Sequence, residues 1–267
     1  MNGVIGSSHP VAGATRAAAG PAGRAMLGAS HVSRRLLEMS GVIASALARA
    51  ATLPTARGAR MRAQAASFGV LGADVCAVHG IKVVVSGAVP TEPCFIVGNH
   101  VGYLDPIAIA SVVPCTAIAK QEIDGWPLIG NRARELGIVF IKRDDAMSGA
   151  RVLKTVISRY RHGVSVQNFP EGSTTRGDFL LPLRRGIFGA ARLVSAPVVP
   201  VRVDLEEREL AWVGDDAFVP HYLKLAARPS TVVRLRFGAP LLSERFASAE
   251  ALSEAAREFL ARRSDLS

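Results

Sequence analysis

The sequence predicts an α/β fold with a mixed, largely parallel sheet flanked by helices and preceded by an amphipathic N-terminal helical segment. From about residue 80 onward, short apolar runs alternate with longer segments of helical periodicity, which is typical of strands joined by helical crossovers. Polar peptides directly follow two of these apolar runs, as expected at the edge of the sheet where reactive groups gather. The length of 267 residues suits one sizeable domain with an additional segment.

The first part of the chain, residues 1–33, is rich in Ala, Gly and Ser and has neither an acidic residue nor an apolar period. Such a composition predicts a disordered leader. It lacks the basic start and apolar stretch of a secretory signal, whereas its Arg-bearing, acid-poor character is typical of an organelle transit peptide. An overextended start site, with Met26 or Met39 as the true beginning, is an equally open interpretation.

Residues 34–66 combine an apolar helical stretch with Arg residues at both ends. Glu38 and Arg49 interrupt the apolar stretch, so it is too short to span a bilayer. Basic residues around an apolar helical face favour a helix lying on an anionic membrane surface. We therefore expect a membrane-associated protein, peripheral or monotopic, at the cytoplasmic face. A helix packed on the domain explains the same pattern equally well.

Seven strands and five helices are expected in the remaining domain, residues 67–267, from the apolar periods and the turn residues between them. The strands are expected at residues 81–85, 94–98, 116–119, 138–141, 164–169, 198–203 and 232–237. The helices are expected at about residues 106–113, 126–135, 145–161, 186–195 and 247–263. The third helix has the clearest ends, because Asp144 and Asp145 precede it and Gly163 follows it.

The net charge of +10 is concentrated in the N-terminal part of the chain. Residues 1–66 contain eight Arg, no Lys and one acidic residue, Glu38, and so carry +7, which leaves +3 for the rest. A DNA-binding function would therefore rest on the high pI of the leader alone. We expect no nucleic-acid partner.

The three cysteines, Cys76, Cys94 and Cys115, each lie in an apolar stretch and show no Cys-x-x-Cys spacing. Their odd number and their surroundings predict buried, reduced thiols. The sequence gives little support for a zinc site, and we expect no metal.

Two peptides about seventy residues apart carry the chemistry. They are Asn-His-Val-Gly-Tyr-Leu-Asp-Pro at residues 99–106 and Phe-Pro-Glu-Gly-Ser at residues 169–173. His100 and Asp105 stand five positions apart, so they cannot share one face of a regular helix. Asp followed by Pro is a favoured start of a helix, which we therefore expect to begin at Pro106. The preceding loop, which contains a Gly, can then fold the imidazole back over the carboxylate.

A carboxylate bonded to one imidazole nitrogen fixes the tautomer and leaves the other nitrogen available as a base. His100 and Asp105 are thus predicted to form a general-base pair without a serine, with the nucleophile supplied by the substrate. The alternative gives Asp105 a helix-capping role only and His100 a simple hydrogen bond at a strand end. The second peptide, which places Glu171 at the end of another strand, favours the catalytic interpretation.

These peptides resemble two motifs, Asn-His-x4-Asp and Phe-Pro-Glu-Gly, of the glycerolipid acyltransferases typified by bacterial lysophosphatidic acid acyltransferase. Residues 137–143 resemble the second block of that family and residues 196–201 its fourth block. Residues 180–186 resemble the segment after the third block, with Arg184 where Lys is usual. The resemblance covers about residues 78–240, and four blocks in the family's order make it specific.

The resemblance implies transfer of an acyl group from acyl-CoA or acyl-carrier protein to the hydroxyl of a lysolipid in membrane lipid synthesis, without a further cofactor. His100 would deprotonate the hydroxyl, Asp105 would orient His100, and backbone N–H groups would stabilise the oxyanion. Arg143 would contact the acceptor phosphate, and Glu171 with Gly172 would position the acceptor. Residues 67–267 would form the acyltransferase domain, with membrane lipids and the acyl donor as partners.

The third block departs from the pattern of the phosphatidate-forming enzymes, which usually continue Thr-Arg-Ser after Glu-Gly. This chain has Ser173, Thr174 and Thr175 there, so Thr174 replaces an Arg that would bind phosphate through bidentate, charge-assisted bonds. Either Arg176 reaches back, or the acceptor is not a simple phosphomonoester. A block of this kind resembles enzymes that acylate lysophospholipids with larger head groups or lyso-ornithine lipids. Ser173, Thr174 and Arg176 complete the predicted substrate-binding set.

Other functions have less support from the sequence. It contains no Gly-x-Ser-x-Gly elbow of a serine hydrolase and no phosphate-binding loop or dinucleotide fingerprint. A non-catalytic lipid-binding relative of the same fold is the main alternative, and the presence of His100, Asp105 and Glu171 speaks against it. Two residues have local alternatives: Arg143 can pair with the acidic residues that follow it, and Glu171 can be a turn carboxylate bonded to backbone N–H groups.

Overall fold

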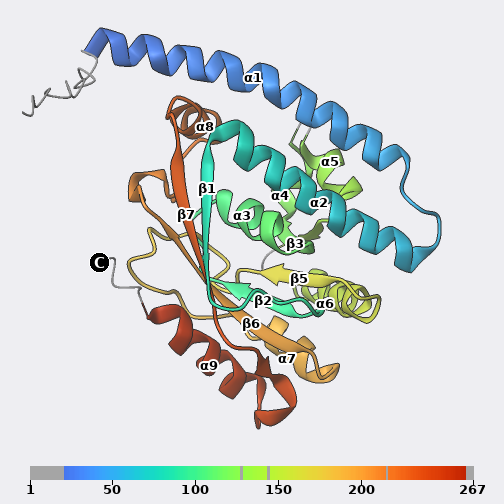
Figure 1. Cartoon of the computed structure of the whole chain (residues 1–267). Helices are drawn as coiled ribbons and strands as arrows, with labels where there is room; N and C mark the ends of the chain where they lie inside the picture. Colours follow the sequence, from blue (N-terminus) through green and yellow to red (C-terminus); the bar gives the residue numbers. More distant parts are fainter. Residues whose placement is uncertain (1–20, 127–128, 143–144, 215, 263–267) are drawn as a thin grey trace, which may run out of the picture.

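The computed structural model describes residues 21–126, 129–142, 145–214 and 216–262. Within these ranges, eight strands form one sheet in the order β1-β7-β6-β2-β5-β3-β4, with β8 paired to β6 (Figure 1). The strands are β1 Ile81–Ser86, β2 Phe95–Gly98, β3 Cys115–Lys120, β4 Val139–Ile141, β5 Ser165–Asn168, β6 Pro197–Leu205, β7 Thr231–Phe237 and β8 Leu241–Leu242. All seven strands expected from the sequence are present.

The sheet is mixed and largely parallel, as predicted. Strands β6, β2, β5, β3 and β4 are paired in parallel as neighbours. Strand β7 is antiparallel to β6, and β1 at the edge of the sheet is parallel to β7. The central strand β2 is buried along its whole length, as expected for a strand with helices over both faces.

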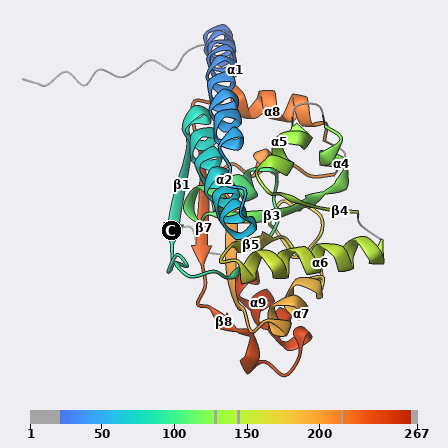
Figure 2. The same ribbon diagram turned by 90° about the vertical axis from the view of Figure 1, so that its right-hand side faces the viewer.

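Helices cover both faces of the sheet. In the described residues they are α1 Pro21–Ala51, α2 Arg57–His79, α3 Leu104–Val112, α4 Gln121–Asp124, α5 Ile129–Glu135, α6 Ala146–Arg161, α7 Gly186–Leu193, α8 Phe218–Ala226 and α9 Ala249–Ala261. Helices α2 and α3 pack on one face, and α6, α7 and α9 pack on the other (Figures 1 and 2). The domain therefore has three layers, with the sheet in the middle.

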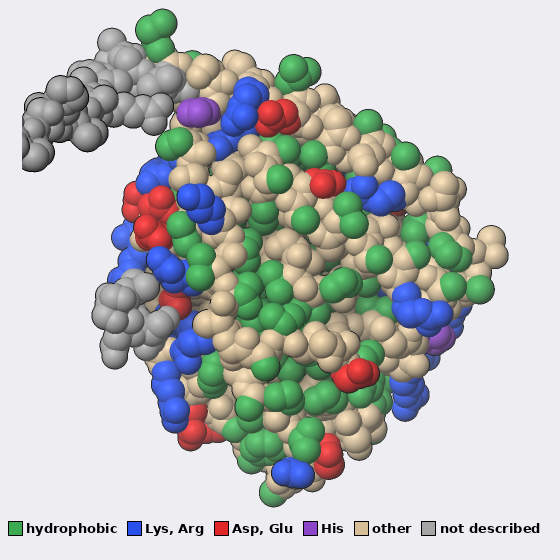
Figure 3. All heavy atoms as spheres, viewed as in Figure 1, with side chains coloured by type: hydrophobic (Ala, Val, Ile, Leu, Met, Phe, Trp, Pro, Cys, Tyr) green, Lys and Arg blue, Asp and Glu red, His purple; other side chains and the backbone are tan. Residues whose placement is uncertain are grey.

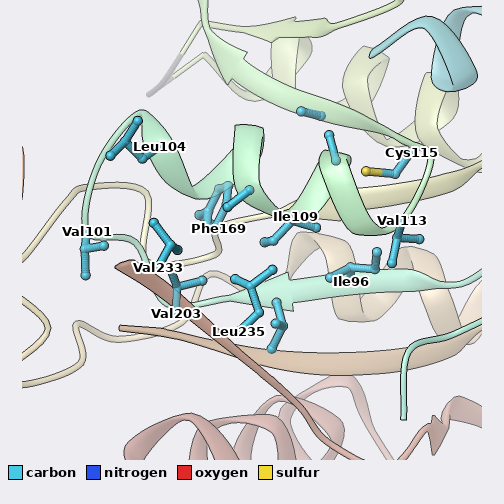
Figure 4. Close-up of a cluster of buried hydrophobic side chains, with 14 of the residues drawn as sticks. Ile96, Val101, Leu104, Ile109, Val113, Cys115, Phe169, Val203, Val233 and Leu235 are labelled. Carbon is cyan, nitrogen blue, oxygen red and sulfur yellow. The ribbon is translucent and has the colours of Figure 1, made fainter. Parts of the chain in front are cut away.

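The first face holds the larger hydrophobic core. Its α3 side chains point toward the sheet, where they meet residues of β2, β6 and β7 (Figure 4). The labelled members of this contact include Leu104, Ile109, Ile96, Val203 and Leu235, each at most 4% exposed. Because the Asn-His-x4-Asp motif ends in the first turn of α3, this packing fixes the start of the helix that carries Asp105.

Four of the five expected helices, those at residues 106–113, 145–161, 186–195 and 247–263, are found with ends shifted by at most two residues. The fifth, expected at 126–135, is found as α5, with the short α4 before it. Helix α8 was not predicted. Its third residue is Pro220, which is tolerated because the first turn of a helix leaves its N–H groups without intrahelical partners.

The N-terminal part differs from the expectation. Helix α1 begins at Pro21, so the prediction of disorder for residues 1–33 is wrong for residues 21–33, whose Ala content supports a helix; residues 1–20 lie outside the described ranges. The segment 34–66 is not one helix, because the chain turns around Pro54. The expected boundary at residue 66 falls inside α2, which packs extensively on α3. In the described residues, none of the helices has the length and apolar character needed to cross a membrane.

A buried arginine attaches α1 to the domain. The guanidinium of Arg35 is fully buried and donates hydrogen bonds to six backbone carbonyls, at the C-terminal ends of α2 and α8 and just beyond them. These ends carry partial negative charge and carbonyls without intrahelical partners. Burial lowers the pKa of Arg35 from its usual value, but a guanidinium still remains charged at neutral pH. One side chain thus joins three helices, and part of the segment expected to contact a membrane packs on the domain.

We expect Arg35→Leu to lower the free energy of unfolding by about 2–3 kcal/mol, because buried carbonyls would lose their donors. The matched control is Arg34→Leu, since Arg34 is largely exposed and forms only a surface ion pair with Glu38. Urea unfolding followed by circular dichroism measures both. Equal midpoints for the two variants would contradict the role assigned to Arg35.

Candidate active site

The peptides at residues 99–106 and 169–173 lie close together because the strands before them are neighbours in the sheet. Strands β2 and β5 are paired in parallel, with Val97 opposite Asn168, so their carboxyl ends lie at the same edge of the sheet. His100 follows the end of β2 by two residues, and Glu171 follows the end of β5 by three. The short loops after these strands therefore have to share one small region.

His100 and Asp105 form the predicted pair. The imidazole Nδ1 lies 2.7 Å from the carboxylate Oδ2 of Asp105, which is the distance of a strong, charge-assisted hydrogen bond. The Asp105 side chain is fully buried, whereas that of His100 is 19% exposed. A carboxylate acceptor requires the proton on Nδ1, so Nε2 is the unprotonated nitrogen of the neutral ring. In the described residues, no protein group is hydrogen-bonded to Nε2.

The helix does not begin where the sequence predicted. Helix α3 starts at Leu104 with Tyr103 at the N-cap position, so Asp105 lies in the first turn and Pro106 is not the first helical residue. The reason is the carboxylate itself: Oδ2 also accepts hydrogen bonds from the backbone N–H groups of Val101 (2.7 Å) and Gly102 (3.0 Å). The acid thus holds the loop before the helix together and orients the imidazole with the same oxygen.

Three further contacts fix the position of His100. Its ring stacks on Phe169 with the centroids 4.3 Å apart and the planes 15° from parallel. Its backbone N–H donates to Oε1 of Glu171 at 2.8 Å, and its carbonyl accepts from the N–H of Thr175 at 2.8 Å. Both main-chain bonds come from the loop after β5. The second peptide therefore holds the first one in place.

The carboxylate of Glu171 joins two loops. Oε1 accepts from His100 N–H, and Oε2 accepts from the backbone N–H of Leu181 at 2.8 Å. Burial raises the pKa of Glu171, and these two hydrogen bonds act in the opposite direction. The contacts match the turn-carboxylate alternative stated above. The predicted contact of Glu171 with the acceptor stays a prediction.

The other predicted substrate-binding residues lie around this loop. Gly172 has a positive φ of 71°, and a Cβ there would come within 2.9 Å of Arg184 Nε, so only Gly fits. Ser173 is exposed and Thr174 is half-buried. Arg176 lines a small cavity together with Val101, Asp204 and Arg208, not the position beside Gly172. Arg143 lies outside the described residues.

The cation that the structure places beside the Glu-Gly turn is therefore Arg184 rather than Arg176. The backbone N–H of Arg184 donates to the carbonyl of Pro170 at 2.8 Å, which brings its side chain over Gly172. Sequence reasoning noted Arg184 only as a variant of a family Lys. Its position in a Leu-Pro-Leu-Arg-Arg-Gly stretch after the third block was the available signal.

Two polar residues that support the site were not assigned roles from the sequence. The amide of Asn99 bonds both the N–H and the carbonyl of Val203, at 2.7 and 2.8 Å, and so ties the end of β2 to β6. Arg202 is buried and bonds Asp204, the carbonyl of Gly177 and the carbonyl at the end of α9. Both hold the loops of the site through long-range contacts, which local sequence patterns do not reveal.

Aromatic residues pack against the loop that joins His100 to α3. The hydroxyl of Tyr103 lies 3.0 Å from Nδ1 of His221 on α8, and its ring packs edge-on against Trp212 and Phe218. The N–H of Trp212 donates to the carbonyl of Val101 at 2.9 Å. Burial lowers the pKa of His221, which favours a neutral ring whose Nδ1 can accept a hydrogen bond from the Tyr103 hydroxyl. Helix α8, absent from the sequence prediction, therefore contributes to the site.

Comparison with known proteins shows that the chain is similar to acyltransferases. A family model described as Acyltransferase matches residues 78–204. The lyso-ornithine lipid O-acyltransferase of Pseudomonas aeruginosa is 29% identical over 189 residues, which cover 68% of this chain and 72% of that protein. The 1-acyl-sn-glycerol-3-phosphate acyltransferase of Neisseria meningitidis is 35% identical over 133 residues, which cover 49% of this chain and 52% of that protein.

The fold agrees with this class. The crystal structure of the 1-acyl-sn-glycerophosphate acyltransferase PlsC from Thermotoga maritima superposes with a TM-score of 0.64, covering 89% of this chain and 94% of that one, at 20% identity. The likeness at this identity concerns the fold. The family model and the curated relatives show that the chain is similar to the glycerolipid acyltransferases over its central part.

We expect Glu171→Gln to lower kcat by about 10- to 100-fold, with little change in KM for the acceptor. The amide has one acceptor oxygen, so its NH2 group would face either His100 N–H or Leu181 N–H and displace the base. Steady-state kinetics with a lysolipid acceptor separates the two constants, and the exposed Glu92→Gln is the matched control. A higher KM at unchanged kcat would instead indicate that Glu171 binds the acceptor.

Proposed function

We propose that this protein transfers a fatty acyl group from an acyl-CoA or acyl-carrier-protein thioester to the hydroxyl of a lysolipid. The observation that carries the proposal is the buried carboxylate of Asp105 bonded to Nδ1 of His100, with Nε2 left as a base. Such a pair needs a nucleophile that brings its own proton, and a lysolipid hydroxyl is one. The match of residues 78–204 to the Acyltransferase family model supports the same reaction.

The geometry accounts for each step of the transfer. Nε2 of His100 takes the hydroxyl proton as the oxygen attacks the thioester carbonyl, and Asp105 stabilises the imidazolium that forms. The C–S bond of the tetrahedral intermediate then breaks. The leaving thiolate takes the proton from Nε2, which restores the neutral ring. The stacked Phe169 and the main-chain bond to Glu171 keep the ring from turning during these steps.

The acceptor follows less directly from the site. The relatives named above act on lyso-ornithine lipid in one case and on 1-acyl-sn-glycerol-3-phosphate in the other. Thr174 cannot provide the bidentate contact to a phosphomonoester, whereas Arg184 beside Gly172 can meet a phosphodiester or a carboxylate. We therefore propose an acceptor whose head group contains a phosphodiester or a carboxylate, which one arginine can contact, rather than a phosphomonoester. A lysophospholipid with a larger head group and a lyso-ornithine lipid both meet this description.

A non-catalytic lipid-binding role is the alternative. It requires the same fold and the same lipid contacts but no proton acceptor. A pair held by four hydrogen bonds and an aromatic stack, with no hydrogen bond to Nε2 from the described residues, has no evident purpose in simple binding.

We expect purified protein to form a diacylated product that His100→Ala does not form. The acceptor panel is lysophosphatidate, lysophosphatidylcholine, lysophosphatidylethanolamine and lyso-ornithine lipid, each with palmitoyl-CoA or palmitoyl-carrier protein, and mass spectrometry identifies the product. The variant should stay folded, because Asp105 keeps its two backbone donors, but its unfolding midpoint should fall with the loss of one hydrogen bond and of the stack on Phe169. Product from lysophosphatidate alone would contradict the acceptor class proposed here. No product from any pair, in a folded protein that binds lipid vesicles, would favour the lipid-binding alternative.

We also propose that α1 and α2 bring the protein to a membrane. The outward side of α1 exposes Leu36, Leu37 and Ile43, with Leu37 74% exposed. Hydrophobic side chains also gather at the centre of the face over α2 and β1, with Lys and Arg toward its left and right edges (Figure 3). An apolar surface with a basic border is what a helix or domain uses to lie on an anionic bilayer.

We expect the double variant Leu36→Ser, Leu37→Ser to partition about tenfold or more weakly to vesicles that contain anionic lipid, because two apolar side chains would be lost from the contact. The matched control is Met147→Ser, Leu193→Ser, which removes two equally exposed apolar side chains from α6 and α7. Cosedimentation measures both. Equal loss in the two variants would mean that α1 has no special part in membrane association.

A further inference from the structure

An apolar groove lies on the face of the molecule that carries α6 and α7. Its volume is about 350 Å³, and it is open to solvent. It is lined by Leu153 and Ile157 of α6, by the small residues Gly189 and Ala190 of α7, and at one end by Leu193. Leu193 is 73% exposed. Helices α1 and α2 lie over the opposite face of the sheet (Figure 2).

Exposed basic residues lie on both of the helices that line this groove. Helix α6 contains four Arg or Lys residues and no acidic residue, and its Lys154 and Arg161 are exposed. On α7, Arg192 is exposed as well. In the described parts of the chain, no acidic group lies within ion-pair distance of these three. Arg185, at the start of α7, differs because it pairs with Glu250 at 2.7 Å.

The groove is connected to the active site through one short segment. Arg184, whose side chain covers Gly172, is two residues before Gly186, which lines the groove. The loop from Glu171 to Arg184 is fixed at both ends, by the contact of Glu171 with His100 and by the hydrogen bond from Arg184 N–H to Pro170. A molecule seated in the groove therefore lies beside the loop that holds the catalytic base.

We propose that this groove is the docking surface for an acidic acyl carrier protein, which presents its thioester to His100 from the side of the sheet opposite α1 and α2. The inference rests on the proposed acyl transfer and names the donor. A helix of the carrier protein with apolar residues along one side and acidic residues on both flanks would place its apolar side between α6 and α7. Its flanks would meet Lys154 and Arg161 on one side and Arg192 on the other.

The arrangement suits a protein helix better than the nucleotide part of CoA. Phosphate groups are bound by donors that converge on one point, whereas these cations are spread along two helices with an apolar strip between them. An anionic bilayer would meet the same charges but would not enter a groove between two helices. The two substrates would then approach from different faces, the lysolipid from the membrane and the acyl group from a soluble carrier.

The test compares palmitoyl-carrier protein with palmitoyl-CoA as donors for Lys154→Glu, Arg192→Glu and the double variant. The control is Arg245→Glu, Arg262→Glu, which makes the same change of charge at exposed residues after β8 and after α9 that do not line the groove. We expect the double variant to raise KM for the carrier-protein donor about tenfold or more, to leave kcat/KM with palmitoyl-CoA within about twofold, and the control to change neither. In wild type, added salt should raise KM for the carrier-protein donor only.

An unchanged KM for the carrier-protein donor, or an equal loss with both donors, would overturn the proposal. So would a wild-type protein that uses palmitoyl-CoA alone. Binding of unloaded holo-carrier protein, measured by calorimetry with wild type, the double variant and His100→Ala, keeps the two proposals separate. Docking is supported if His100→Ala binds the carrier protein and the double variant does not. This holds even if no donor yields product; in that case only the proposed acyl transfer is contradicted. No binding by wild type overturns docking, whatever the activity with CoA.

Discussion

The structure of the site depends on one buried charge, the carboxylate of Asp105. A carboxylate without exposure to water has to be bonded or neutralised, and here a single oxygen accepts from the imidazole of His100 and from two backbone N–H groups of the same loop. The other oxygen has no hydrogen-bond partner among the described residues. This concentration of donors on Oδ2 shapes the loop between β2 and α3. The loop in turn sets the direction in which the base points.

The loop cannot hold that shape alone, and its supports come from distant parts of the chain. Asn99 attaches it to β6, Glu171 attaches it to the segment after β5, and Trp212 reaches it from the segment before α8. Each contact satisfies backbone groups that a strand leaves open where it ends. The geometry of the candidate site is thus a consequence of how three neighbouring segments complete their hydrogen bonds. Several independent contacts of this kind are needed to hold a side chain in position within a fraction of an ångström.

The sequence predicted the sheet and the hydrogen-bonded pair of His100 and Asp105 because both depend on local patterns. Apolar runs between turn residues locate the seven expected strands, and the spacing of His100 and Asp105 requires a loop that folds back. Three features could not be predicted in this way. Helix α8 has a Pro in its first turn, the bond of Asn99 to Val203 spans 104 positions, and the start of α3 moved because Asp105 bonds the loop instead of capping the helix. The bond of Asn99 depends on a distant partner that a single sequence does not name, and the other two features break a local rule, that Pro marks the start or the end of a helix.

The two faces of the sheet both present apolar side chains beside basic ones, but they differ in shape. On the side of α1, α2 and β1 the apolar side chains stand on an outward surface, as contact with a bilayer requires. Between α6 and α7 they line a groove, and the exposed cations of these two helices would attract an anionic molecule over longer distances than apolar contacts do. If the lysolipid and the acyl donor use these two faces as proposed, the sheet keeps them apart, and neither has to displace the other. The loop that carries His100 follows the carboxyl end of β2, at an edge of the sheet where the two faces meet.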